Sequence, residues 1–261
     1  MTELDVDLEH GELEVVGRIA VASNATFVGR IGGSSVVYKP VAGEKPLWDF
    51  PDGTLADREV AAYLVSEAFG WGIVPRTWLR DGPLGPGMVQ LWQEQDAEQD
   101  PVDVVPARGA VLDGWRVVLE GSDADDQPVR LIHEDSPALR RMAVFDAVVN
   151  NADRKGGHVL PLRDGRRLGV DHGVTFHVEP KLRTVLWGFL GEPLTADELE
   201  GVRRVRTDLE DDGEGGLGGR LAPLLDDVEL VALAERCDRL LRTEIFPSPE
   251  GDMPSVPWPL F

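Results

Sequence analysis

The first third of the chain alternates short apolar runs with turn residues. The runs are residues 13–22, 26–31, 35–38, 74–79 and 88–92. Alternation of apolar and polar residues with a period of two predicts half-buried strands. The pair Gly32-Gly33 between two of these runs is typical of a hairpin turn. We therefore expect a small β-rich lobe.

Helical spacing interrupts this lobe once and then dominates the second half of the chain. The helix within the lobe starts near Thr54 or Asp57 and stops at Gly70. Further helices are predicted after Ser136-Pro137, after the capping-box sequence 195–198, and within residues 221–241. The tail, residues 246–261, contains five prolines and is expected to be extended rather than helical.

Composition and charge narrow the classes of protein. A chain of 261 residues with 42% hydrophobic residues is long enough for one large two-lobed domain or two small ones. The net charge of -21 disfavours nucleic-acid and membrane partners, because the sequence shows no local basic patch to oppose it. Cys237 is the single cysteine, which excludes an internal disulfide and a multi-cysteine zinc site. We see no signal peptide and no apolar run of about 20 residues, so we expect a cytoplasmic protein.

Two aspartates stand where phosphoryl transfer would need carboxylates. Asp153 follows the helix predicted after Ser136 and precedes the glycine pair Gly156-Gly157. Asp171 follows a short apolar run in the sequence Gly-Val-Asp-His-Gly. An aspartate in a turn is common for structural reasons alone. Two aspartates with this joint spacing favour a site in which one is the catalytic aspartate and the other is a metal ligand.

A lysine and a glutamate complete the set in the β-rich lobe. Lys39 ends an apolar strand-like run, and Glu59 lies in the helix that follows. A strand lysine paired with a helix glutamate holds ATP phosphates in protein kinases. A lysine at a strand end is otherwise usually a solvated edge residue, so Lys39 gains its meaning from the other motifs.

Together these motifs resemble the phosphatidylinositol 3-/4-kinase-like branch of the protein-kinase fold, including its HipA-related members. The resemblance rests on residues 37–40, Glu59, residues 151–154 and residues 170–173. The chain resembles in particular a family of uncharacterised actinobacterial proteins in that branch. The resemblance implies an α+β, bilobal protein-kinase-like fold, with a small β-rich N-lobe, a mostly helical C-lobe, and ATP with Mg²⁺ or Mn²⁺ as cofactors.

The patterns along the chain also predict how it is divided, and the resemblance gives the parts their expected roles. The expected parts are a nucleotide-binding lobe at 8–92, an acidic connector and start of the C-lobe at 93–135, a helical catalytic lobe at 136–245, and a Pro-rich tail at 246–261.

Each matching residue receives a role from the resemblance. Asp153 would orient the acceptor hydroxyl and take its proton late in the transfer. Arg154 would neutralise Asp153 or bind a phosphate, and Lys155 would contact the transferring group. Asp171 would bind the metal that bridges the β- and γ-phosphates. Lys39 would contact the phosphates, held by an ion pair with Glu59.

Two further segments are candidates for contacts with the nucleotide. Ser23, Asn24 and Thr26 lie where a phosphate-covering loop belongs, although small polar residues there also fit an ordinary hairpin turn. The segment after the last strand of the lobe is the expected place for the purine. Its candidate residues are Gln90, Leu91 and Trp92.

His158 departs from the family pattern, which has asparagine five residues after the catalytic aspartate. An imidazole suits Mg²⁺ poorly and Mn²⁺ or Zn²⁺ better. His158 is therefore a candidate metal ligand, with a phosphate contact or a structural role as alternatives. Asn150 or Asn151 is an alternative source of a metal-binding oxygen.

The sequence thus predicts an ATP-dependent phosphotransferase that acts on a protein or small-molecule hydroxyl. The acidic surface and the lack of a basic amphipathic segment disfavour a lipid acceptor. Two alternatives stay open: a nucleotide-binding pseudokinase without turnover, supported by the replaced asparagine, and a nucleotidyl (AMP) transferase on the same fold.

Overall fold

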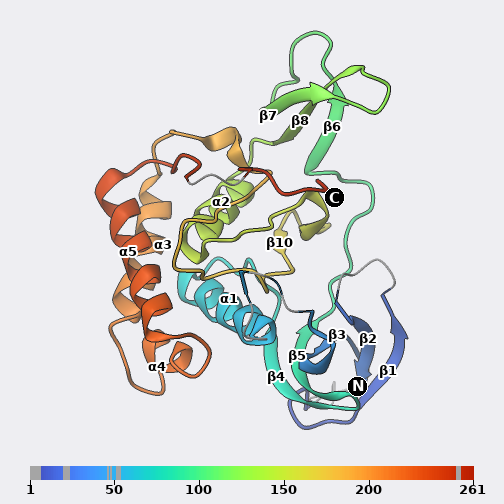
Figure 1. Cartoon of the computed structure of the whole chain (residues 1–261), viewed down its shortest axis with the longest axis vertical. Coiled ribbons are helices and arrows are strands. Elements are labelled where there is room, and N and C mark those ends of the chain that lie inside the picture. Colours follow the sequence, from blue (N-terminus) through green and yellow to red (C-terminus); the bar gives the residue numbers. More distant parts are fainter. Residues whose placement is uncertain (1–6, 20–23, 46, 48, 51–53, 251–253) are drawn as a thin grey trace.

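A five-stranded antiparallel sheet forms the N-terminal part of the molecule (Figure 1). The computed structural model describes residues 7–19, 24–45, 47, 49–50, 54–250 and 254–261. The strands run in the order β1-β2-β3-β5-β4. Their bounds are β1 Leu13–Arg18, β2 Phe27–Ile31, β3 Ser34–Pro40, β4 Thr77–Gly82 and β5 Gly85–Leu91. A strand is therefore present within each run predicted from alternation. The first strand ends at Arg18, and residues 20–22 of its predicted run lie outside the described residues.

The central strand β3 shows why alternation predicts the sheet. Val36 and Tyr38 are fully buried on one face of the sheet, and the side chain of Lys39 lies on the opposite face. The backbone of Lys39 pairs with that of Met88 in β5. The turn before β3 has Gly32 at a φ of 57°, a left-handed conformation that glycine adopts without a Cβ clash. The predicted hairpin is confirmed, and it places Lys39 at the end of a rigid strand.

One helix, α1 (Leu55–Phe69), packs beside β4 and β5 (Figure 1). It ends at Gly70, whose φ of 69° is the left-handed cap that the sequence predicts. At its start, the backbone N–H groups of Leu55 and Ala56 donate to the carboxylate of Glu44. This carboxylate satisfies donors that the first helical turn leaves free, and it fixes α1 relative to the end of β3.

The second part of the molecule is mostly helical. It contains α2 (Pro137–Val149), α3 (Ala196–Asp208), α4 (Leu217–Leu221) and α5 (Asp227–Thr243). Ser136 caps α2 by accepting the N–H of Leu139, and Thr195 forms the predicted capping box with Glu198. α2 contributes much of the core, since Leu139, Met142 and their apolar neighbours are buried.

The connector predicted at 93–135 contains strands that the sequence analysis does not anticipate. β6 (Val102–Pro106), β7 (Trp115–Ser122) and β8 (Pro128–Glu134) form a sheet in the order β6-β8-β7, which projects from the helical part (Figure 1). A two-stranded ribbon, β9 (Val159–Pro161) and β10 (Arg167–Gly169), follows α2. Single-turn helices lie at Val41–Gly43, Gly156–His158 and Trp187–Phe189.

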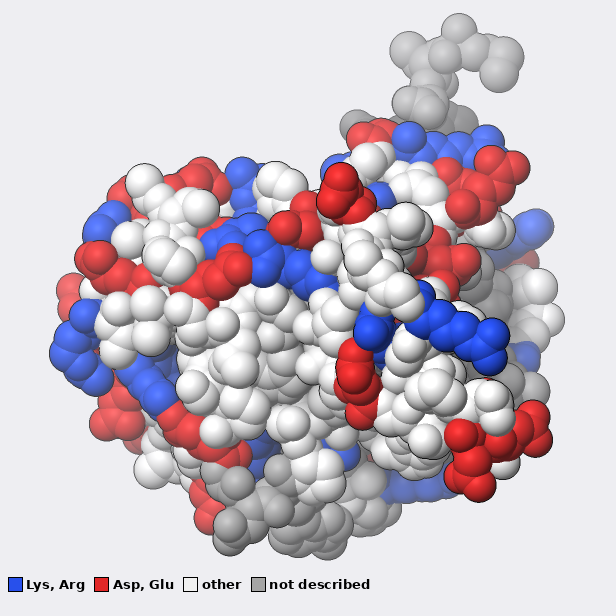
Figure 2. Space-filling view, turned by 90° about the horizontal axis from the view of Figure 1, so that it is seen from above, with Lys and Arg blue, Asp and Glu red and all other residues white. Residues whose placement is uncertain are grey.

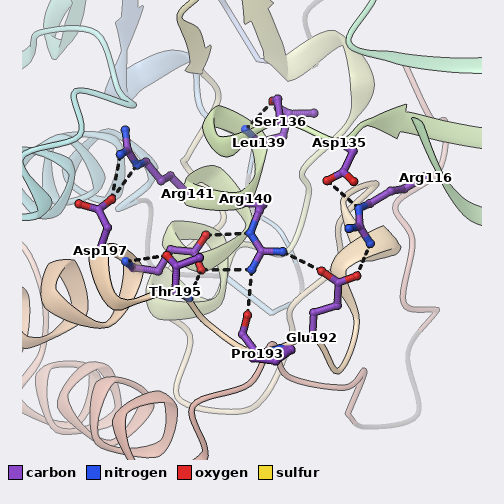
Figure 3. A network of polar contacts seen from close by, with 11 residues as sticks. Arg116, Asp135, Ser136, Leu139, Arg140, Arg141, Glu192, Pro193, Thr195 and Asp197 are labelled. Atoms are coloured by element: carbon purple, nitrogen blue, oxygen red, sulfur yellow. Dashed lines mark hydrogen bonds and ion pairs between the residues drawn. The ribbon is translucent and has the colours of Figure 1, made fainter. Parts of the chain in front are cut away.

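Ion pairs fasten the projecting sheet to the helices (Figure 3). Arg116 of β7 pairs with Asp135 at 2.8 Å and also with Glu192. Glu192 in turn pairs at 2.8 Å with Arg140 of α2, which reaches Glu198 of α3 at 3.0 Å. Because one network joins β7, α2 and α3, the projecting sheet and the helices are held together as one framework.

The α+β class and the division into a β-rich part and a mostly helical part are confirmed. The exact domain boundaries stay predictions. Figure 2 shows Lys and Arg side chains interleaved with Asp and Glu on the face seen there, around a broad uncharged area. Within the part of the chain that the structure describes, no helix combines the length and the apolar character that crossing a bilayer requires.

Candidate active site

Three segments far apart in the sequence meet at Lys39. Its Nζ lies 2.6 Å from Oε1 of Glu59 in α1 and 2.8 Å from Oδ1 of Asp171, just after β10. Glu59 is 2% exposed, and its second oxygen accepts the backbone N–H of His172 at 2.9 Å. The strand, the helix and the Asp171 loop are thus joined through one glutamate and one lysine.

The charges in this cluster stabilise one another. Burial opposes the charge on Lys39, but the carboxylates of Asp171 and Glu59 outweigh it and raise the pKa of Lys39 above its usual value. The Lys39 ammonium in turn holds the pKa of Asp171 well below its usual range. Both groups are therefore charged at neutral pH.

Asp171 also has an unusual backbone conformation. Its φ is 61°, in the left-handed region that costs a non-glycine residue energy unless its surroundings compensate. Its side chain is about half exposed (51%) although it is bonded to a largely buried lysine. A strained and accessible carboxylate is a common feature of functional sites.

Asp153 is positioned by the residues that end α2. Asn150 adopts the left-handed cap conformation, and the side-chain oxygen of Asn151 accepts the N–H of Asp153 at 3.0 Å. Oδ2 of Asp153 then lies 3.0 Å from Nζ of Lys155. Burial raises the pKa of Asp153, and the Lys155 ammonium partly opposes this rise. Lys155 therefore makes the contact with Asp153 that was predicted for Arg154. Its predicted contact with the transferring group stays a prediction.

His158 joins the two aspartate loops. Its Nδ1 lies 2.9 Å from the backbone carbonyl of Asp153, which can only accept, so Nδ1 carries the hydrogen. Nε2 is left with its lone pair and lies 3.4 Å from Oδ2 of Asp171. Burial lowers the pKa of His158, although the Asp171 carboxylate partly opposes this, and the neutral ring is favoured. Nε2 of His158 and Oδ2 of Asp171 are thus two adjacent potential metal ligands.

A cavity of about 210 Å³ is lined by five of the thirteen predicted site residues. Lys39, Glu59, Asp153 and Asp171 all line it, as does Asn24 from the segment between β1 and β2. Further walls come from Glu44, Lys45, Leu47, Leu55, Met88 and Val174. Polar groups converge on this space from the sheet, from α1 and from both aspartate loops.

The predicted role of Arg154 is wrong, because its side chain is completely buried. The guanidinium binds both oxygens of Asp146, at 2.9 and 2.8 Å, and Nη2 also lies 2.6 Å from Nε2 of His172. Nη1 donates to the carbonyls of His158 and Val170. Arg154 therefore cannot neutralise Asp153 or meet a phosphate; it fixes the two aspartate loops to each other and to α2.

The predicted purine contacts at Gln90, Leu91 and Trp92 stay predictions for the backbone carbonyls and the Trp92 ring, but three donors of these residues are already used within the sheet. The backbone N–H of Leu91 donates to the carbonyl of Arg76, and that of Trp92 to the carbonyl of Ser35. The side chain of Gln90 is buried and donates to the hydroxyl of Thr77. The sheet has taken up these donors, and none of the three residues lines the cavity.

The predicted phosphate-covering loop is only partly described. Ser23 lies outside the described residues. Asn24 lines the cavity, and its side-chain oxygen accepts the N–H of Lys45 at 3.0 Å. Thr26 is 5% exposed, and its carbonyl accepts the N–H of Ile19, so it closes the β1–β2 hairpin instead.

The asparagines before Asp153 have structural roles. The side chain of Asn150 donates to the carbonyls of His177 and Glu179. Asn151 donates to Asp146 at 2.9 Å, in addition to its bond with Asp153. Among the described residues, no group of three or more His, Cys, Asp or Glu side chains is arranged to hold a metal ion.

The sequence analysis missed Asp146 and Glu44. Asp146 is fully buried among apolar residues of α2, and a charged residue in such a stretch is itself a signal that a buried partner exists. Glu44 gave no comparable signal, because its two N–H partners lie in the first turn of a helix that begins eleven residues later.

Comparison with known proteins gives one close relative. Protein Rv2133c of Mycobacterium tuberculosis is 49% identical over 267 aligned residues, which cover 97% of this chain and 94% of that protein. The chain belongs to the family of Rv2133c. No protein-family model matches the chain. Among solved structures, the Helicobacter pylori proinflammatory kinase CtkA is similar over 91% of this chain and 94% of its own, with 12% identity and a TM-score of 0.45.

Proposed function

We propose that this protein is an ATP-dependent phosphotransferase of the kinase type that requires Mg²⁺ or Mn²⁺. The observation that carries the proposal is the convergence of Lys39, Glu59, Asp153 and Asp171 on one cavity. Phosphoryl transfer needs positioning and charge neutralisation more than covalent chemistry by the protein, and these four side chains offer both.

Lys39 is the candidate for binding the phosphates. Its ammonium has three donors, of which Glu59 and Asp171 accept two. The third is available to a phosphate oxygen. Glu59 is buried and also accepts the backbone N–H of His172, so it holds the Lys39 ammonium in a fixed position relative to the Asp171 loop.

We place the proposed divalent ion between Asp171 and His158. Two ligand atoms that bind one ion at about 2.1 Å, at angles from octahedral to tetrahedral, lie roughly 3.0–3.4 Å apart. Nε2 of His158 and Oδ2 of Asp171 are 3.4 Å apart. An octahedral Mg²⁺ or Mn²⁺ would draw these two atoms together by about 0.4 Å. The remaining ligands would be phosphate oxygens and water. Such an ion would neutralise charge on the β- and γ-phosphates, and an imidazole ligand favours Mn²⁺ over Mg²⁺.

Asp153 is the candidate for orienting the acceptor. In the proposed reaction the acceptor oxygen forms a bond to the γ-phosphorus, the bond from that phosphorus to the β,γ-bridging oxygen breaks, and ADP leaves. The acceptor proton passes to the carboxylate of Asp153, whose pKa is raised by burial. The acceptor is a hydroxyl of a protein or of a small molecule.

Incubation with ATP labelled at the γ- or the α-phosphate tests this function. We expect label from the γ-phosphate to appear on an acceptor, on water or on the protein itself, and no transfer of the α-label. Asp153→Asn should abolish transfer while ATP still raises the melting temperature. Asp164→Asn, at an exposed aspartate in the β9–β10 turn, is the matched control.

Each other result would change the assignment. Transfer of the α-label would support a nucleotidyl transferase, and ATP binding without transfer of either label would support a pseudokinase. Full activity in Asp153→Asn would remove this residue from the mechanism.

A further inference from the structure

The tail of the chain lies against the loop that carries Asp153. We call residues 254–261 the C-terminal strap. It is the last part of the Pro-rich tail, and it ends against Gly156 at the start of the single-turn helix Gly156–His158. Val256 and Leu260 pack against the main hydrophobic core, while Trp258 is 80% exposed. The strap is therefore docked through some side chains and leaves others in solvent.

One end of the strap is anchored beside the Asp153 loop. The carbonyl of Ser255 accepts the backbone N–H of Thr184 at 3.1 Å and the indole N–H of Trp187 at 2.8 Å. Thr184 forms a parallel bridge with Arg154, the residue that follows Asp153. Ser255 is thus bonded to the segment that pairs with Arg154 at the start of the Asp153 loop.

The other end of the strap covers the glycine pair after Asp153. The carbonyl of Leu260 accepts the N–H of Gly156 at 2.8 Å. A Cβ on Gly156 would lie 2.3 Å from Cε1 of Phe261, and one on Gly157 would lie 3.8 Å from the carbonyl carbon of Phe261. The Phe261 ring occupies the space that a side chain at position 156 would need. A glycine at this position is therefore required by the contact with Phe261 as well as by any need for backbone freedom.

We propose that the C-terminal strap positions the catalytic loop, with Phe261 as a positioning residue for Asp153 and His158. This inference rests on the proposed function. Gly156-Gly157 connects those two residues, and glycines have more backbone freedom to lose than any other residue. The strap removes this freedom from one side, while Arg154 fixes the loop from the buried side.

The geometry at risk is the spacing between the two aspartate loops. His158 follows the glycine pair directly, and its ring bridges the Asp153 carbonyl at 2.9 Å and Asp171 at 3.4 Å. If the glycine pair is released, both contacts lose their support. A displacement of about 1 Å in a catalytic group can lower turnover by up to about a hundredfold. The hydrogen bonds and ion pairs of Lys39 and Glu59 go to each other, to Asp171 and to His172, so binding of the phosphates should persist.

Two substitutions in the full chain and one shortened chain test the proposal. Phe261→Ala removes the ring, and a chain ending at Pro259 also removes the bond to Gly156. Trp258→Ala is the matched control, because this aromatic side chain of the same strap is mostly in solvent. Phe261 is itself 56% exposed, so its removal should leave the fold intact.

The first readout is hydrogen exchange of the amides of residues 151–154. Their hydrogen-bond partners lie in α2, in Asn151 and in the segments at Val174 and Arg183, not in the strap. We expect exchange there to rise at least about tenfold in both strap variants and not in Trp258→Ala. Unchanged exchange in both strap variants would overturn the proposal, whether or not the protein is a kinase.

The second readout is turnover of γ-labelled ATP. We expect kcat to fall at least about tenfold in Phe261→Ala, with KM for ATP within about twofold of the parent protein. A rise in kcat would overturn the proposal, because it would make the strap an inhibitor. A parent protein that binds ATP without transferring label would refute the proposed function alone, and the exchange result would still decide whether the strap orders the loop.

Discussion

The buried pair of Arg154 and Asp146 gives the sharpest prediction about stability. Both side chains are 0% exposed, and the guanidinium meets the two carboxylate oxygens at 2.9 and 2.8 Å. Asp146→Asn keeps the shape of the side chain but removes its charge. The guanidinium of Arg154 would then be a buried cation with only carbonyls, an imidazole and an amide around it.

The magnitude follows from what buried ion pairs cost when one partner is lost. Removing one member of such a pair destabilises a protein by about 3–5 kcal/mol, since the other charge stays out of water. For chains of this size, 1 kcal/mol changes the melting temperature by roughly 2–4 °C. We therefore expect Asp146→Asn to lower the melting temperature by roughly 6–20 °C.

The assay is thermal and urea unfolding followed by circular dichroism. Glu200→Gln is the control, because Glu200 pairs with Arg203 at 3.4 Å on the surface and its loss should cost no more than about 1 kcal/mol. The double variant Asp146→Leu, Arg154→Met should recover much of the loss, because no charge is left buried. A cost below about 1 kcal/mol for Asp146→Asn would refute the reasoning.

Two further predictions concern single groups. Lys155→Met should shift the acidic limb of the activity profile to higher pH, because the Lys155 ammonium lowers the pKa of Asp153 and the base form is lost as pH falls through that pKa. Lys155→Arg should leave the limb in place, and a shift to lower pH in Lys155→Met would contradict the assignment. Cys237 is fully buried and burial raises its pKa to about 12, so a thiol reagent should label it only as fast as the protein unfolds. Rapid labelling of the native protein would show that this part of α5 opens locally.

Local signals were sufficient for most of the elements. Gly70 ends α1, Ser136 caps α2 and Thr195 opens α3, because each satisfies backbone groups within a few residues of itself. The alternation in β3 likewise fixed which face is buried. Such features depend on the chain's near neighbours, which the sequence displays directly.

The projecting sheet was missed because two of its three strands, β6 and β7, are poorly buried. Only Val102 of β6 is buried, and none of the residues of β7 is. Because the adjoining turns are rich in acidic residues, the sequence pattern of residues 93–135 indicated a connector and not a sheet. These strands are held by pairing with β8 and by Arg116, and both interactions join residues that the sequence pattern does not relate.

The site was predictable in its charges but not in its supporting contacts. Lys39, Glu59 and Asp171 are recognisable from sequence motifs, and they meet as expected. The burial of Arg154 depends on Asp146, which belongs to a helix eight residues earlier, and on loops that close around the guanidinium. The acceptor, the metal and the cellular location stay predictions.

The central claim is that His158 and Asp171 bind one divalent ion beside Lys39 and Asp153. Crystals grown with Mn²⁺ and a non-hydrolysable ATP analogue, measured at the manganese absorption edge, test it most directly. We expect an anomalous peak within about 2.3 Å of Oδ2 of Asp171 and Nε2 of His158, with the γ-phosphate facing Asp153. A nucleotide bound elsewhere, or a manganese ion bound without Asp171, would contradict the account.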